Sequence, residues 1–135
     1  MPAGGSVLDV GCGVGTQALH LAAAGFRVRG IDIVPKAVGT ARAAAASRGL
    51  NVEFSVGDFY HNDPDGPYEL VLDRSVLSNA NDHSERARFA DRVASALAPG
   101  GWWLNITPCA DNRDPHDPKG GPDPRGYPRL TLIGP

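Results

Sequence analysis

The sequence is poor in the residues that mark several common classes of protein. Its 135 residues include only two cysteines, Cys12 and Cys109, too few for a disulfide framework or a cysteine-based zinc site. Basic residues are not in excess, since 13 Lys and Arg stand against 15 Asp and Glu and the formal net charge is −2. Nucleic acid is therefore not an expected partner, because binding to phosphates requires a positively charged face.

Long apolar stretches and leader-like segments are also missing. No apolar run approaches the roughly 20 residues that a membrane-spanning helix needs, so no membrane partner is expected. The first residues, MPAGGS, contain neither a basic segment nor an apolar one, and they predict no secretory signal. Together with the low cysteine content, this pattern predicts a reduced, cytoplasmic protein.

What is present is the composition of an ordinary globular domain, with 41% hydrophobic and 21% charged residues. Apolar runs that predict strands alternate with segments that predict helices over the first hundred residues. This alternation predicts an α/β fold, a doubly wound and mainly parallel sheet with helices on its faces. The expected strands are 6–10, 27–33, 51–56, 68–73 and 102–107, and the expected helices are 16–24, 35–47 and 84–97.

The character of the chain changes after Thr107. Seven of the twelve prolines lie at or beyond Pro108, among glycines and aspartates. Such a segment does not hold a helix or a central strand, so we expect a core over 1–107 and a Pro/Gly-rich loop or tail over 108–135. Within the tail, only the short run 130–133 has the pattern of an edge strand.

Three glycines alternate in the stretch VLDVGCGVGTQALHLA, residues 7–22, where the first strand meets the first helix. In a doubly wound sheet, ligands bind at the carboxyl ends of the strands, where Gly11, Gly13 and Gly15 are expected to lie. Glycine lets backbone N–H groups approach a ligand, and the N-terminus of the next helix favours electron-rich groups. The spacing G-x-G-x-G differs from the dinucleotide pattern G-x-G-x-x-G, and a purely structural turn is the alternative.

Acidic residues stand near the ends of the first four strands. Asp9 lies two residues before the first glycine, and we expect its carboxylate to point into the crevice. Asp32 ends the second strand, where a carboxylate can accept hydrogen bonds from both hydroxyls of a ribose; a helix cap before Pro35 is the alternative. Asp58 and Asp73 follow the third and fourth strands. Together the four acids are expected to line one rim of a nucleoside-cofactor site.

These segments resemble the ordered motifs of class I, Rossmann-like S-adenosylmethionine-dependent methyltransferases. The similar segments lie within about residues 6–107 and are VLDVGCGVG, GID, VGDF, LVLDRS and APGG. The resemblance implies the strand order 3-2-1-4-5 and S-adenosylmethionine as cofactor, with S-adenosylhomocysteine as product. It also implies in-line methyl transfer to a small-molecule nucleophile. LDRS and GWWLNI are further similar to methyltransferases of the thiopurine or tellurite-resistance kind.

The resemblance also implies a role for each motif. The glycine loop and Asp9 would border the methionine part of the cofactor, Asp32 the ribose hydroxyls, and Asp58 the adenine amino group. Asp73 would lie near the methionine end and the substrate. The complete set of implied cofactor-binding residues is Asp9, Gly11, Cys12, Gly13, Gly15, Thr16, Asp32, Ile33, Gly57, Asp58, Phe59 and Asp73.

The sequence does not single out a catalytic base, and the reaction does not require one. A sulfonium methyl group is already electrophilic, so alignment of the nucleophile is the main task. Asp73 and His83 are the candidates, although an exposed histidine at a helix N-terminus is the commoner case. Arg74, Ser75 and Asn79, after the fourth strand, are candidates for binding the substrate. Arg74 has two alternative partners, Asp73 or an anionic substrate group.

Two other groups are interpreted as having no nucleophilic or metal-binding role. Cys12, inside the glycine loop, is interpreted as a small residue that fills space rather than as a nucleophile. His116 lies between Asp114 and Asp117, but this spacing fits no regular pattern of metal ligands, so no metal site is predicted.

The chain departs from the resembled family at both ends. Class I methyltransferases usually carry helices before the first strand and two more strands after the fifth, the last antiparallel. Here the first strand begins near residue 6 and the sheet is expected to stop at the fifth strand, without strands six and seven. This implies a cradle without a lid. Unless the proline-rich tail covers it, the fifth strand would also present an open edge that would invite a homodimer. The alternative function is therefore a weak or inactive S-adenosylmethionine-binding fragment that needs a partner or second chain.

Overall fold

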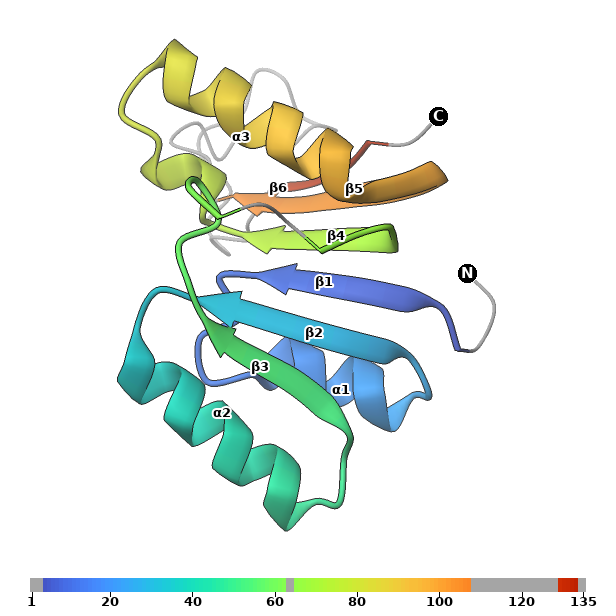
Figure 1. The fold of residues 1–135 in the computed structure, drawn as a ribbon. Helices are drawn as coiled ribbons and strands as arrows, with labels where there is room; N and C mark the ends of the chain where they lie inside the picture. The colour runs from blue at the N-terminus through green and yellow to red at the C-terminus, as the bar shows by residue number, and fades with distance from the viewer. Residues whose placement is uncertain (1–3, 63–64, 108–128, 134–135) are drawn as a thin grey trace, which may run out of the picture.

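The sheet of this protein carries helices on both faces, as the computed structural model shows for residues 4–62, 65–107 and 129–133 (Figure 1). Helices α1 and α2 cover one face, and α3 covers the other. The elements in chain order are β1 (Ser6–Val10), α1 (Thr16–Ala23), β2 (Arg27–Asp32), α2 (Pro35–Ser47), β3 (Val52–Val56), β4 (Tyr68–Arg74), η1 (Leu77–Asn79), α3 (His83–Ala96), β5 (Leu97–Thr107) and β6 (Arg129–Ile133).

The strands are ordered β3-β2-β1-β4-β5-β6, and the first five are parallel. The predicted order 3-2-1-4-5 is confirmed. The largest difference in boundaries is at β5, which begins at Leu97 instead of Trp102. The pairing of β4 with β5 shifts register between Tyr68 and Leu70, so the APGG segment lies inside an irregular start of this strand.

The expectation that the sheet stops at β5 is wrong. Strand β6 pairs with β5 in antiparallel fashion, from Trp103 opposite Ile133 to Thr107 opposite Arg129. The run 130–133 is thus confirmed as an edge strand. Because β6 occupies the outer edge of β5, the open edge and the strand-paired homodimer inferred from it no longer follow. Residues 108–128, which include Cys109 and His116, lie outside the described residues.

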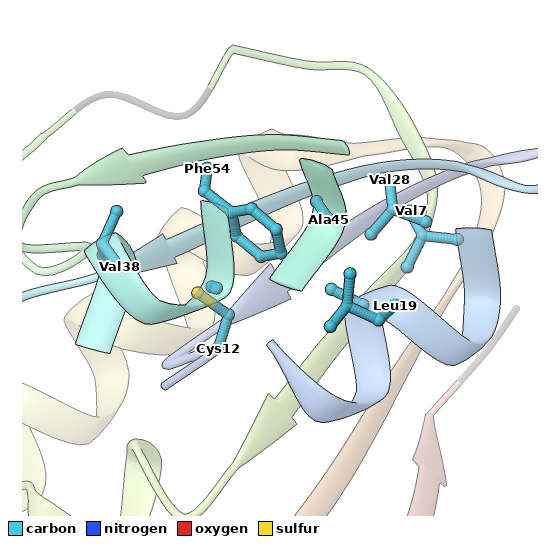
Figure 2. Packing of buried hydrophobic residues seen from close by; sticks show 9 residues of the cluster. Val7, Cys12, Leu19, Val28, Val38, Ala45 and Phe54 are labelled. Carbon is cyan, nitrogen blue, oxygen red and sulfur yellow. The ribbon is translucent and has the colours of Figure 1, made fainter. Parts of the chain in front are cut away.

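Alternation along the strands builds two separate cores, because successive side chains of a strand point to opposite faces. On β1, Val7 joins the cluster beneath α1 and α2, whereas Leu8 and Val10 join the cluster beneath α3. Figure 2 shows the first cluster, in which the Phe54 ring points from β3 towards Cys12. The side chains at the strand ends are divided between the two faces in the same way.

The two tryptophans of β5 follow the same rule. Trp103 is buried, 9% exposed, whereas its neighbour Trp102 is 38% exposed, which confirms that adjacent positions face opposite sides. The Trp103 ring lies 6.0 Å from the Phe89 ring of α3, and Phe89 lies 5.2 Å from Phe59. These aromatic contacts fix α3 against the sheet.

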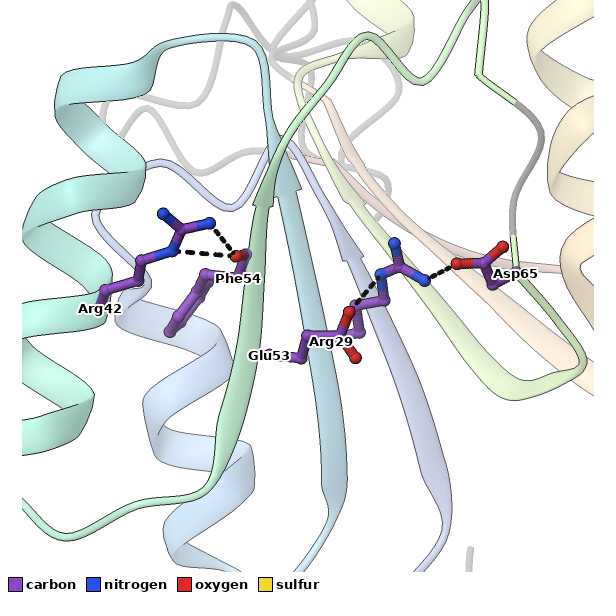
Figure 3. Close-up of polar contacts among 5 residues, drawn as sticks. All are labelled: Arg29, Arg42, Glu53, Phe54 and Asp65. Atoms are coloured by element: carbon purple, nitrogen blue, oxygen red, sulfur yellow. Dashed lines mark hydrogen bonds and ion pairs between the residues drawn. The ribbon is translucent and has the colours of Figure 1, made fainter.

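Arginine side chains bind the outer strand β3 and its neighbour β2 (Figure 3). Arg42 of α2 donates from Nε and Nη2 to the carbonyl oxygen of Phe54, at 3.1 and 2.7 Å. Gly57 N donates to the carbonyl oxygen of Asp32 on β2. Because the backbone groups of successive residues in a strand point to opposite sides, the carbonyl of Phe54 points away from β2, to the free edge of β3. The guanidinium therefore occupies an edge acceptor that another strand would otherwise pair with. Arg29 forms ion pairs with Glu53 and Asp65.

Replacing Phe54 with alanine should lower the free energy of unfolding by about 3–5 kcal/mol, because the ring is only 4% exposed and its loss leaves a cavity. Urea denaturation of the two proteins measures the difference. Val56→Ala is the matched control on the same strand, and since Val56 is 47% exposed its effect should stay within about 0.5 kcal/mol. Equal losses for the two variants would contradict this account of the core.

Candidate functional site

A cavity of about 480 Å³ opens at the carboxyl edge of the parallel strands, around the ends of β1, β2 and β4. The strand order reverses here, because the chain leaves β1 for β2 on one side and later returns to β4 on the other. The volume lies within the range of small-molecule sites. The lining residues are Val10, Gly11, Ile31, Asp32, Ile33, Gly57, Asp58, Phe59, Tyr60, Arg74, Ser75, Val76 and Asn79.

The glycine turn after β1 is a left-handed bend at all three alternate positions, with φ of +71°, +55° and +84°. A Cβ at Gly15 would lie 2.8 Å from the Phe54 ring, and one at Gly11 would lie 2.2 Å from Cγ2 of Val76. A Cβ at Gly13 would meet nothing within 4 Å. Two of the three glycines are thus required by close packing within the protein, whereas the surface at Gly13 is open.

Asp32 ties the glycine turn to the end of β2. Its Oδ2 accepts a hydrogen bond from Gly13 N, and its Oδ1 accepts one from Val34 N, both at 2.8 Å. The bond to Val34 N lies before α2, whose N-cap residue is Val34 and has no side-chain cap hydrogen bond, so Asp32 does not cap that helix. A carboxylate can accept about four hydrogen bonds, which leaves acceptor capacity on both oxygens. Because Asp32 also lines the cavity, that capacity is available to a ligand.

Asp58 also lines the cavity, after β3, and is held by two local bonds. Its Oδ1 accepts from Tyr60 N at 2.9 Å, and its Oδ2 lies 2.7 Å from Nδ1 of His61. Burial acts to raise the pKa of Asp58, but the hydrogen bonds from His61 and Tyr60 N outweigh it and the net pKa is lowered. The carboxylate is therefore ionised at neutral pH. The partner His61 is exposed.

The expectation that Asp9 points into the crevice is wrong. Its side chain is 1% exposed and lies on the same face of β1 as Val7, below the N-terminus of α1. Burial raises the pKa of Asp9 to about 7, although the backbone N–H of Ala18 donates to the carboxylate and lowers it in part. Its Oδ2 has no hydrogen-bond partner among the described residues. Asp9 therefore supports the start of α1 rather than lining the cavity.

Asp73 is also buried, at 0% exposed, and it does not line the cavity either. Its Oδ2 accepts from Nδ2 of Asn105, its register partner on β5, at 2.5 Å. Its Oδ1 accepts from Val76 N at 2.9 Å. Burial raises the pKa of Asp73. No ion pair joins Arg74 to Asp73 within the residues that the structure describes.

Of the four acids predicted to line one rim, only Asp32 and Asp58 line the cavity. The reason is the alternation of side chains along parallel strands in register. Val10 of β1 is the register partner of Asp73, so Asp73 faces α3, as Val10 does. Asp9, one residue before Val10, faces α1.

The other predicted residues divide between the lining and its support. Ile33, Gly57 and Phe59, from the cofactor set, line the cavity, as do the substrate candidates Arg74, Ser75 and Asn79. Those that do not line it are Cys12, Gly13, Gly15, Thr16 and His83. His83 is exposed at the first turn of α3, where the Asp82 side chain accepts from Ser84 N and Glu85 N. Burial raises the pKa of the Cys12 thiol to about 12, in accord with a space-filling role.

Sequence reasoning missed four lining residues: Val10, Ile31, Tyr60 and Val76. The hydroxyl of Tyr60 donates to the carbonyl oxygen of Val76 at 3.3 Å and thereby joins the loops that follow β3 and β4. The signal that could have found it is its position directly after the VGDF motif. Nothing in the local pattern around Val76 marks that residue.

Over the residues that the structure describes, no helix has the length and apolar character that crossing a bilayer requires. Among the same residues, no three His, Cys, Asp or Glu side chains are grouped as ligands of a metal ion would be.

A parallel sheet with a glycine turn after its first strand and a cavity-lining acid after its second defines a Rossmann-like domain of the kind that binds nucleoside cofactors. Comparison with known proteins narrows this class. The model of the methyltransferase domain family matches residues 7–101. The chain belongs to this family, as its resemblance to class I S-adenosylmethionine-dependent methyltransferases implied.

Individual relatives agree with this assignment. A 2-heptyl-1-hydroxyquinolin-4(1H)-one methyltransferase of Mycobacteroides abscessus is 38% identical over 71% of this chain and 43% of its own. A solved S-adenosylmethionine-dependent methyltransferase of Methanosarcina mazei is 32% identical, with a TM-score of 0.71 over 78% of this chain and 53% of its own. The N-methyltransferase NodS of Bradyrhizobium japonicum, solved with S-adenosylhomocysteine, is 25% identical, with a TM-score of 0.67 over 76% and 52%. The chain spans less than half the length of the curated relatives it matches.

Gly11→Ala should destabilise the protein more than Gly13→Ala. Both positions have positive φ, which costs a non-glycine residue about 1–2 kcal/mol. Only at Gly11 would the new methyl group also overlap a side chain, that of Val76. Thermal unfolding of the two variants measures the difference, and equal melting temperatures would show that the contact with Val76 does not restrict this position.

Asp9→Asn should be more stable than the parent at pH 8 and close to it at pH 4. Because folding raises the pKa of Asp9 from 3.8 to about 7, the folded state favours the protonated acid, and stability is lost as the pH rises through this range. At about 1.4 kcal/mol per pH unit, the loss is at most about 4 kcal/mol. Urea midpoints at pH 4 and 8 measure it. An advantage of the variant that does not grow with pH would contradict the burial of a carboxyl group.

Proposed function

We propose that this chain is the cofactor-binding domain of a methyltransferase that uses S-adenosylmethionine to methylate a small-molecule nucleophile. The observation that carries the proposal is the Asp32 carboxylate, which lines the cavity with spare acceptor capacity while it holds the glycine turn through Gly13. The names of the relatives support it, since they include O- and N-methyltransferases of small molecules.

The cavity suits the nucleoside part of this cofactor. Two ribose hydroxyls can donate to Asp32, whose oxygens keep free acceptor positions. Ile33, directly after it, lines the cavity and is 63% exposed, so an adenine ring packed on it would remove apolar surface from water. Asp58, ionised and fixed by Tyr60 N and His61, offers an acceptor for an amino group. The backbone at Gly13 is open on the side where the methionine part would extend.

The bound cofactor would supply an electrophilic methyl group, and the residues of this chain would orient the reactants. Burial raises the pKa of Tyr60, so its hydroxyl stays protonated at neutral pH and is not a general base. Asp73 and His83, the predicted candidates, do not line the cavity. We therefore propose that the acceptor is a nucleophile that reacts without a base from the described residues, such as a thiolate or phenolate.

The substrate side of the cavity is proposed to be the wall after β4. Arg74, Ser75 and Asn79 line it, and Arg74 brings a positive charge next to hydrogen-bonding groups. A cation at this position favours an anionic acceptor, which agrees with a thiolate or phenolate substrate.

Asp32→Ala should weaken binding of S-adenosylhomocysteine by about 1–3 kcal/mol, through loss of a charged acceptor and of the bond to Gly13 N. Isothermal titration calorimetry measures this change. Asp91→Ala, at an exposed position of α3, is the control and should leave the affinity unchanged. An Asp32 variant that binds as tightly as the parent would overturn the ribose assignment.

The function itself is tested by titrating the chain with S-adenosylhomocysteine, then supplying S-adenosylmethionine with a panel of thiols, phenols and amines. We expect micromolar binding, with transfer to thiols or phenols ahead of amines. Failure of a folded chain to bind would contradict the proposal. Binding without transfer to any acceptor would contradict the activity and leave a cofactor-binding domain.

A further inference from the structure

We propose that Asp73 and Asn105 are a pair of positioning residues that hold the wall after β4 against the glycine turn. This proposal rests on the proposed function only in that the wall would contact the cofactor and its methyl acceptor. Neither side chain lines the cavity, and they are 0% and 7% exposed. Their influence on the site is therefore indirect and acts through the backbone that Asp73 binds.

The Asp73 carboxylate fixes the start of that wall. Its Oδ1 accepts from Val76 N at 2.9 Å and from Leu77 N at 3.4 Å, at the beginning of η1. Between them and Asp73 lies Ser75, a non-glycine residue with φ of +65°. Such a conformation persists only where its surroundings enforce it. The bonds to Asp73, with the bond from Ser75 N to Ile106 O at 2.8 Å, provide that enforcement.

Asn105 fixes the carboxylate in turn. It lies opposite Asp73 in the β4–β5 register and donates from Nδ2 to Oδ2 of Asp73 at 2.5 Å. With one oxygen bound by Asn105 and the other by two backbone N–H groups, the carboxylate has one preferred orientation. A residue of β5 thereby determines where the loop after β4 lies.

Val76 is the point where this arrangement reaches the site. Its Cγ2 lies so close to Gly11 that a Cβ there would be 2.2 Å away, and its carbonyl accepts from the Tyr60 hydroxyl. Val76 therefore meets the glycine turn, the loop after β3 and the cavity at once. A shift of Val76 would move the wall on the substrate side and release the packing at Gly11 together.

The test is a swap of the two side chains, with Asp73→Asn, Asn105→Asp and the double variant compared with the parent. Asn105→Asp places two carboxyl groups face to face, with no donor between them. Asp73→Asn replaces one accepting oxygen with an NH2 group, which keeps a partner only if the Asn105 amide turns so that its Oδ1 accepts. The double variant restores one donor and one acceptor without that turn. Amide hydrogen exchange at Val76 and Leu77 in the ligand-free chain is the first readout. The affinity for S-adenosylhomocysteine is the second.

We expect Asn105→Asp to exchange these two amides at least tenfold faster and to bind at least threefold more weakly, Asp73→Asn to lose less of both, and the double variant to recover most of what Asn105→Asp loses. Val38→Ala, in the core beneath α2, controls for general destabilisation and should speed exchange at these amides no more than elsewhere in the chain. A double variant no better than Asn105→Asp would overturn the proposal, as would selective effects equally large in Val38→Ala. If the parent does not bind S-adenosylhomocysteine, the proposed function fails, but the exchange data still decide whether the pair positions the loop.

Discussion

The carboxylate of Asp32 joins the two turns on which the candidate site depends. One oxygen holds Gly13 in the turn after β1, and the other holds Val34 just before α2 begins. Backbone bonds from Gly11 N and Cys12 N to Ile31 O hold the start of the glycine turn, at 2.9 and 3.1 Å. The bond to Asp32 adds a restraint at Gly13, the glycine whose Cβ position is open, and glycine loses more conformational freedom on folding than any other residue. A single side chain thus both orders the edge of the cavity and offers spare acceptors to a ligand.

The other acids near the strand ends serve different purposes, and the pleat of the sheet assigns them. Asp58 lines the cavity at a loop, where no strand dictates its direction. Asp9 and Asp73 lie within strands, so their faces are set by alternation, one towards α1 and the other towards α3. Both are buried and carry raised pKa values, and both support backbone N–H groups next to the site. Two of the four acids thus hold backbone groups beside the site, and the other two line the cavity.

The methyltransferase domain family is represented here by the sheet and the cavity at its carboxyl edge, within a chain shorter than the curated relatives it matches. The two strands at the ends of the parallel set, β5 and β3, are each covered at least in part. Strand β6 covers β5, and the Arg42 guanidinium occupies a carbonyl on the free edge of β3. Such edges limit pairing with a second chain. The described part of the chain thus forms a sheet that needs no second copy to cover β5.

Local pattern determined much of this protein. Alternating strand and helix segments predicted a doubly wound parallel sheet, and the glycines and Asp32 marked the switch point, because these features depend on a few adjacent residues and on handedness rules. The strand order 3-2-1-4-5 followed from the resemblance to the methyltransferase family. Only the tertiary structure decided that Asp73 meets Asn105, that Tyr60 reaches Val76 and that β6 returns to β5. These contacts join segments distant in sequence. Their existence depends on register and on the face of the sheet, which a one-residue shift would reverse.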